Sequence, residues 1–186
     1  MSKIYVNEIR HSGGAVAAMQ FDSTGLVSLP NSVYITRFSL QSNLTANGDL
    51  TDWASPSLSK QVSSIGSAVT VSSGVFTFPV TGIWRIHANL RVLAISDTSV
   101  GLSYAVSTDG GSTFTDDYVF GSEGDGSTST NTGSIVLTDY LNVDNVSNVK
   151  MKIVGDSISA SSYVQGIASS SGMRTWVSFE RITDAQ

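Results

Sequence analysis

A stretch of alternating residues between positions 74 and 93 is the strongest constraint on the fold of this chain. In its second half every other side chain is apolar, and the side chains between them are polar or charged. The apolar row is Trp84, Ile86, Ala88, Leu90 and Val92, and the other row is Arg85, His87, Asn89 and Arg91. A period of two sustained over this length is typical of a half-buried strand and excludes a helix. We expect the apolar row to lie on a core and the uneven polar row to meet solvent or another subunit.

The same stretch contains a sequence motif. Residues 75–78 alternate as a shorter strand and are closed by Pro79, which cannot donate to a sheet ladder and therefore belongs at a strand end. The motif Gly-x-Phe-x-x-Pro-x-x-Gly-x-aromatic-x-Ile is formed by Gly74, Phe76, Pro79, Gly82, Trp84 and Ile86. It resembles the signature of the globular heads of the complement and tumour-necrosis-factor superfamily, with Trp84 where that family usually has Tyr. The resemblance covers residues 33–183. It implies a jelly roll that assembles as a tight homotrimer and recurs at the tips of bacteriophage fibres.

Alternating segments recur along the rest of the chain. Residues 32–40 and 102–106 have this pattern, and Gly110 and Gly111 mark the turn of a hairpin that returns at Phe114. Residues 116–133 are predicted to be a polar surface loop. Trp53 is predicted to pack over a sheet edge from a loop, with a carbohydrate platform as the alternative. Because no segment has a helical period, we expect an all-β, antiparallel jelly-roll sandwich. The side chains expected in its core are Phe76, Phe78, Trp84, Ile86, Leu90, Val177 and Phe179.

Composition narrows the class of protein. Only 13% of the residues are charged, and Ser, Thr, Gly and Asn fill the polar positions, as in extracellular and virion β-proteins. The net charge is −5 with scattered Lys and Arg, so no nucleic-acid partner is expected. The absence of Cys excludes disulfides and thiolate metal sites. The N-terminus lacks the apolar core of a signal peptide, and no run is long enough to span a membrane. We expect synthesis in the host cytoplasm and a location in the virion.

Residues 1–31 differ in character from residues 32–186, and we predict two parts, a leader and a head. The leader contains two short alternating segments around a turn at residues 22–25, which alone are too small to bury a core. The segments KIYVNEIRHSGG and MQFDSTGLVSLP resemble the starts of tail-fibre and appendage proteins of marine bacteriophages, which dock a fibre onto the particle. A disordered leader is the alternative. The residues predicted to dock are Ile4, Val6, Met19, Phe21, Val27 and Leu29.

The sequence offers few candidates for catalytic or metal-binding residues. The histidines available as a catalytic base are His11, in the leader, and His87, in the middle of a strand, and we expect no enzymatic activity. An acidic cluster is formed by Asp116, Asp117, Glu123 and Asp125. Close carboxylates on a loop can bind calcium, but they also keep a loop solvated, and their spacing matches no defined calcium loop. We expect no cofactor, with calcium at this cluster as the alternative.

Two classes of function fit these features. In the first, the chain is a virion structural protein, a short fibre or capsid decoration. Its trimeric head displays loops for attachment to a host glycan or protein, or for particle stabilisation, and its leader docks to other virion proteins. In the second, it is a free trimeric module of the lectin or ligand type. A polysaccharide-degrading fibre tip is a third interpretation, which requires two carboxylates facing each other across a cleft.

Overall fold

The computed structural model describes residues 33–56, 63–94, 100–115, 132–158, 161–166 and 173–186 in full. It describes the backbone alone for the strand residues 8–10, 17–21, 27–28, 116–122 and 131. The chain forms two compact units, Met1–Val33 and Tyr34–Gln186. We call them the leader unit and the head, and each is described by itself.

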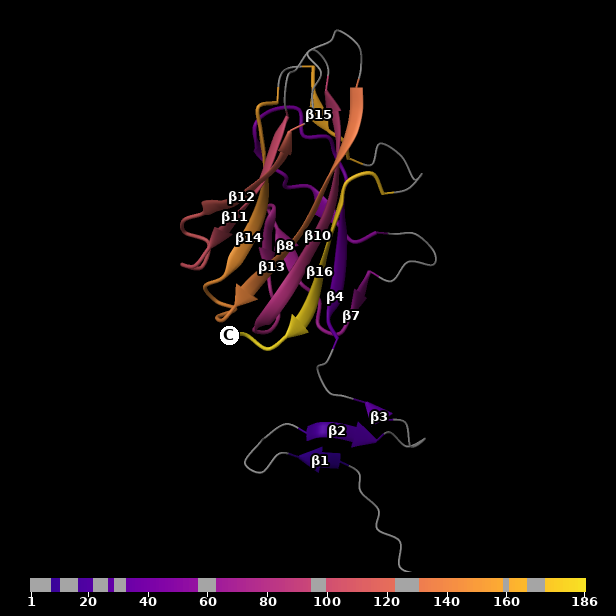
Figure 1. Ribbon diagram of the computed structural model, residues 1–186, viewed down its shortest axis with the longest axis vertical. Coiled ribbons are helices and arrows are strands. Elements are labelled where there is room, and N and C mark those ends of the chain that lie inside the picture. Colours follow the sequence, from indigo (N-terminus) through magenta and orange to yellow (C-terminus); the bar gives the residue numbers. More distant parts are fainter. Residues whose placement is uncertain are drawn as a thin grey trace, which may run out of the picture. The chain divides into compact units, whose positions relative to one another are not determined.

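The leader unit contains a three-stranded antiparallel sheet in the order β1 (Glu8–Arg10), β2 (Ala17–Phe21) and β3 (Val27–Ser28) (Figure 1). Ile9 pairs with Met19, and Phe21 pairs with Val27. Because facing partners share a side of a sheet, these four apolar positions lie on one face. Of the predicted docking residues, Met19, Phe21 and Val27 belong to these strands. The other three, Ile4, Val6 and Leu29, lie outside the described residues.

The head is a sandwich of two antiparallel sheets (Figure 1). The first follows the order β13 (Asn131–Val143), β10 (Gly82–Ala94), β16 (Trp176–Thr183), β4 (Ile35–Leu40), β6 (Trp53–Ala54), with β15 (Tyr163–Val164) beside β10 and β7 (Ser64–Ile65) beside β4. The second follows the order β12 (Thr115–Ser122), β11 (Gly101–Ser107), β14 (Lys150–Asp156), β9 (Val75–Thr77), β8 (Thr70–Ser72), with β5 (Gly48–Asp49) beside β14. Across the described ranges, no helix has the length and apolar character that a membrane crossing needs. The predicted antiparallel jelly roll is confirmed.

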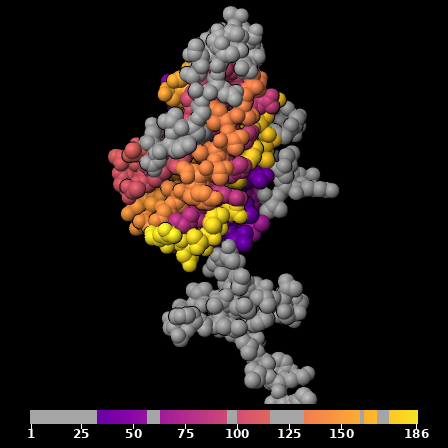
Figure 2. All heavy atoms as spheres, in the orientation of Figure 1, coloured from indigo at the N-terminus to yellow at the C-terminus, as the bar shows by residue number. Residues whose placement is uncertain are grey.

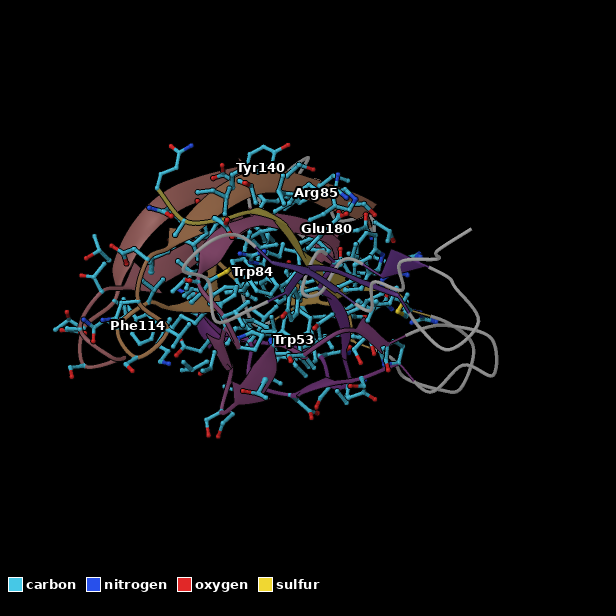
Figure 3. All side chains as sticks on the ribbon, turned by 90° about the horizontal axis from the view of Figure 1, so that it is seen from below. Trp53, Trp84, Arg85, Phe114, Tyr140 and Glu180 are labelled. Atoms are coloured by element: carbon cyan, nitrogen blue, oxygen red, sulfur yellow. The ribbon has the colours of Figure 1, made fainter. Side chains whose placement is uncertain are left out.

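The core lies between the two sheets and is built around aromatic rings. Phe76 of β9 packs 4.9 Å from Phe179 of β16 and 5.5 Å from Phe38 of β4, measured between ring centroids. The ring of Trp84 packs 5.3 Å from that of Phe78, and Figure 3 shows Trp84 in the interior. Strand β10 alternates between buried and accessible residues along its length, as its sequence predicted. All seven predicted core residues are buried: Phe76, Phe78, Trp84, Ile86, Leu90, Val177 and Phe179.

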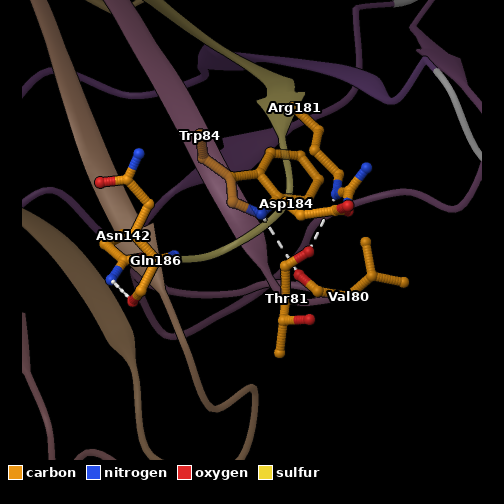
Figure 4. A network of polar contacts seen from close by, with 7 residues as sticks. All are labelled: Val80, Thr81, Trp84, Asn142, Arg181, Asp184 and Gln186. Carbon is orange, nitrogen blue, oxygen red and sulfur yellow. Dashed lines mark hydrogen bonds and ion pairs between the residues drawn. The ribbon is translucent and has the colours of Figure 1, made fainter.

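The chain turns at residues 79–82, directly before and at the start of β10 (Figure 4). The indole Nε1 of Trp84 donates a hydrogen bond to the carbonyl of Val80 at 3.2 Å, and Nε of Arg181 donates to the carbonyl of Thr81 at 2.9 Å. Gly82 is required here, because a Cβ at this position would lie 2.7 Å from the carbonyl oxygen of Thr183. The motif therefore holds the start of the long central strand against the end of the chain.

Two sequence interpretations of the head were wrong. Residues 116–122 belong to β12 and residues 131–133 to β13, so the predicted loop over 116–133 is partly strand. The segment contains Tyr118, Val119 and Phe120, which are residue types that favour strands, but the polar residues around them indicated a loop.

Trp53 is 7% exposed in β6, and its Nε1 donates to the carbonyl of Leu50 at 2.6 Å. A buried indole cannot serve as a carbohydrate platform.

Candidate functional site

The acidic cluster predicted to hold calcium falls outside the part of the chain where side chains are described. Asp116 and Asp117 are in β12, whose side chains are not among those described, and Glu123 and Asp125 lie beyond the described residues. Elsewhere, the described residues contain no group of three or more His, Asp or Glu placed to bind a metal ion. The calcium alternative stays a prediction.

Several exposed apolar side chains of the head belong to strands of the first sheet. Among the described residues of the head, the large apolar side chains that are exposed are Ile65 (46%), Val136 (61%), Tyr140 (59%) and Ile182 (48%). Each belongs to a strand of the first sheet, β7, β13 or β16. Along β13, Val136 and Tyr140 alternate with the buried residues Ile135 and Leu137, so they point away from the core. We call the side of the first sheet that points away from the core the outward face. In Figure 2 the residues of β13, in orange, lie at the surface of the visible side.

An ion pair lies beside Tyr140 on the outward face. Arg85 of β10 faces Tyr140 on one neighbouring strand and Glu180 on the other, and its guanidinium pairs with the Glu180 carboxylate. Figure 3 shows the three side chains on the same side of the head, away from Trp84. The pair is partly exposed, so in isolation it contributes little to stability. It places a neutralised charge next to an exposed aromatic ring.

A row of ring contacts crosses the same face. Nδ1 of His87 is 2.7 Å from the hydroxyl of Thr138, within hydrogen-bonding distance, and its ring lies 5.1 Å from that of Trp176. The guanidinium carbon of Arg37 lies 5.3 Å from the centroid of the Trp176 ring, an arrangement that favours a cation–π contact. The His87 ring is therefore held from two sides, by the Thr138 hydroxyl and by the Trp176 ring.

The outward face combines aromatic side chains, Arg and a paired charge. Aromatic residues and Arg are enriched in protein interfaces. Tyr140, Trp176 and Arg37 are of these types, and Arg85 is paired with Glu180. The sequence analysis predicted that the polar row of β10 lies on the accessible face of the sheet, but it did not predict that β13 adds Val136 and Tyr140 to that face. Ile135 and Leu137 lie two residues apart in the sequence, and the period of two in a strand predicts that Tyr140 lies on the opposite face from them.

Comparisons with known proteins address the fold. No protein-family model and no curated protein matches the chain. Among solved structures, murine APRIL at pH 5.0 aligns with 11% sequence identity and a TM-score of 0.58, over 80% of this chain and 98% of that one. Eiger TNF from S. frugiperda aligns with 10% identity and a TM-score of 0.58, over 84% of this chain and 96% of that one. At this identity the likeness shows the fold alone, a tumour-necrosis-factor-like jelly roll.

Proposed function

We propose that this protein is a homotrimeric, non-catalytic display module of a bacteriophage virion, whose head associates through its outward face. The observation that carries the proposal is the exposure of Val136 and Tyr140 on β13, with Tyr140 beside the Arg85–Glu180 pair on the outward face. Aromatic side chains and Arg are enriched in protein interfaces, which favours association through this face. The rest of the proposal concerns the number of copies and their attachment.

The proposal of three copies is supported by the motif, and closed symmetry is compatible with it. A closed cyclic assembly lets identical heads bury a surface that each alone would expose to water. The motif that includes Gly74, Pro79 and Trp84 resembles the heads of the complement and tumour-necrosis-factor superfamily, and that resemblance favours three subunits. In such an assembly the Arg85–Glu180 pair lies within or beside the contact, where loss of solvent strengthens it.

Attachment to a virion is supported by the leader unit. Its described strands form a three-stranded sheet with Ile9, Met19, Phe21 and Val27 on one face, and a sheet of this size is too small to bury a core by itself. Its sequence resembles the starts of phage fibre and appendage proteins. We propose that it docks to a capsid or tail protein, which makes the protein a short fibre or capsid decoration. A free trimeric module of the lectin or ligand type would share the head and lack this docking.

Replacing Val136 with Glu tests the association of the head. Val136 is exposed, so the fold should tolerate the change, but three buried carboxylates in a symmetric contact should be strongly unfavourable. We expect light scattering to report a trimer for the wild type and a monomer for Val136→Glu. The matched control is Thr70→Glu, at an exposed position of β8 in the other sheet, which should remain trimeric. A wild type that is monomeric at micromolar concentration would contradict the proposal.

A further inference from the structure

The outward side of the second sheet carries a pocket of about 380 Å³. Asn47 and Gly48 form one wall, β11 contributes Gly101, and the end of β14 contributes Val154 and Asp156. Pockets that bind small ligands have volumes of about 300–1,000 Å³. The pocket and the outward face of the first sheet belong to opposite sheets, so association through that face does not by itself cover the pocket.

Glycines form part of the lining of this pocket. A Cβ at Gly48 would meet no atom within 4 Å, so any side chain there would project into open space, and its φ of +147° favours glycine. Gly101 pairs with Asp156 across β11 and β14, and a Cβ at Gly101 would lie 3.4 Å from the Asp156 carbonyl oxygen. The absence of a side chain at Gly101 therefore leaves room beside Asp156, and side chains including Asn47, Val154 and Asp156 complete the lining.

Asp156 and Asn47 are held in a fixed mutual orientation at the pocket. The Asn47 Nδ2 donates to Oδ1 of Asp156 at 3.1 Å, and the backbone N–H of Ser157 donates to the same oxygen at 2.7 Å. Oδ1 of Asn47 accepts from the N–H of Ile158 at 2.8 Å, which fixes the amide orientation. Oδ2 of Asp156 accepts no hydrogen bond from the described residues. A free carboxylate oxygen and the second N–H of an amide therefore stand side by side.

The charges around the pocket narrow the class of ligand. The ammonium of Lys152, four residues before Asp156 on β14, is instead paired with Asp49 at 3.0 Å and lies 4.8 Å from the ring centroid of Phe114. An anionic ligand would be repelled by the carboxylate. A cationic ligand would face the amide N–H, which cannot accept a hydrogen bond. A hydroxyl group both donates and accepts, and it matches the pair.

We propose that this pocket binds a neutral saccharide. The hydroxyl groups of the saccharide would donate to Oδ2 of Asp156 and accept from Nδ2 of Asn47. A C–H face of the sugar ring would pack against Val154 and the backbone of Gly101. The inference deepens the display function proposed above and rests on it only for the source of the sugar, a cell-surface glycan. The binding of the sugar requires a folded head, but it does not require that the heads form a trimer.

The test is saturation-transfer difference NMR and calorimetry of the full chain with methyl glycosides of glucose, galactose and mannose and with N-acetylglucosamine. We expect millimolar binding of at least one neutral sugar, and weaker binding of its uronic acid and amino-sugar counterparts. Asp156→Asn keeps an acceptor for the Ser157 N–H but loses the charged oxygen, and loss of one charge-assisted hydrogen bond should weaken binding about tenfold. Gly101→Ala, which fills the pocket with a methyl group, should weaken it as well.

Asp144→Asn is the matched control, since Asp144 is an exposed carboxylate outside the pocket, and binding should be unchanged. The inference is overturned if no neutral sugar of the panel binds, if only the cationic sugar binds, or if Asp156→Asn binds as well as the wild type. The oligomeric state is measured on the same samples. A monomer that binds sugar contradicts the trimer proposal alone, and a trimer that binds none contradicts this inference alone.

Discussion

Trp84 connects the sequence motif to the stability of the head. Its side chain is fully buried, it packs against Phe78 and Tyr34, and its indole N–H is hydrogen-bonded to Val80. Trp84→Ala should lower the free energy of unfolding by about 3–5 kcal/mol, because it removes the ring and leaves a cavity between the sheets. Urea denaturation measures this change. Trp176→Ala, on the outward face, is the comparison and should cost far less in the isolated head; equal losses would contradict the assigned core.

Asp109 organises the hairpin turn between β11 and β12. Its carboxylate accepts hydrogen bonds from the Thr113 hydroxyl (2.6 Å) and the Thr113 N–H (2.9 Å), and others from the Ser107 hydroxyl and the Ser112 N–H. These bonds, the Thr113 hydroxyl foremost, hold the pKa of Asp109 well below its usual range. A pKa that is lower in the folded state stabilises the fold above the unfolded-state pKa of about 4, and this stabilisation is lost as pH falls through the folded-state pKa.

Asp109→Asn should therefore be less stable than the wild type at neutral pH, and the difference should narrow only in acid. We expect the gap in urea midpoint between the two proteins to be constant from about pH 7 to about pH 5 and to shrink below about pH 4, where Asp109 is protonated in the unfolded chain. Asp144→Asn, at an exposed carboxylate outside this turn, is the control and should differ little from the wild type throughout. A gap that is the same at about pH 3 and about pH 7 would show that charge is not the cause.

At the scale of the element, the turn between β8 and β9 shows why the motif begins with glycine. Ser73 and Gly74 both have positive φ, 48° and 82°, as a tight hairpin of this twist requires. A Cβ at Gly74 would also lie 2.8 Å from the carbonyl oxygen of Leu50. Gly74→Ala should destabilise the head by about 1–3 kcal/mol through backbone strain and this close contact. Thermal unfolding measures it, with Ser73→Gly as the control expected to be nearly neutral. Unchanged stability of Gly74→Ala would contradict the turn geometry.

Strands were predictable from the sequence where one face is buried and the other accessible. The alternation of Trp84, Ile86 and Leu90 identifies β10 because burial follows the pleat. Among the strands that the sequence did not predict, β12 is surrounded by polar residues, and β6, which carries Trp53, is too short to show a period.

The two candidate sites were harder to predict, because they depend on pairing between distant parts of the chain. Tyr140 meets Arg85 only through the register of β13 and β10. Asn47, Gly101 and Asp156 meet only because β5 and β11 flank β14. The register between strands that are distant in the sequence is set by the packing of the whole sandwich, so it cannot be predicted from a local sequence pattern.

At the scale of the whole molecule, the two units suggest a division of labour between attachment and display. The described strands of the leader unit form a sheet with Ile9, Met19, Phe21 and Val27 on one face, whereas the head has its own core of aromatic rings. Ordering a segment costs about 1–2 kcal/mol per residue in backbone entropy, so a small sheet needs a partner surface to offset that cost. A capsid or tail protein can provide it, by contact or by strand addition.

Deletion of residues 1–31 tests this division. The head should remain folded and trimeric, because its core residues all lie within Tyr34–Gln186, and its circular dichroism and light scattering should match those of the same region in the full chain. Incorporation into purified particles should be lost, as quantified by mass spectrometry after complementation with the full-length or the deleted chain. Val136→Glu is the matched comparison, since it impairs association while keeping the leader. If the deleted chain still enters particles at the level of the full chain, the head is the anchor and the roles of the two units are reversed.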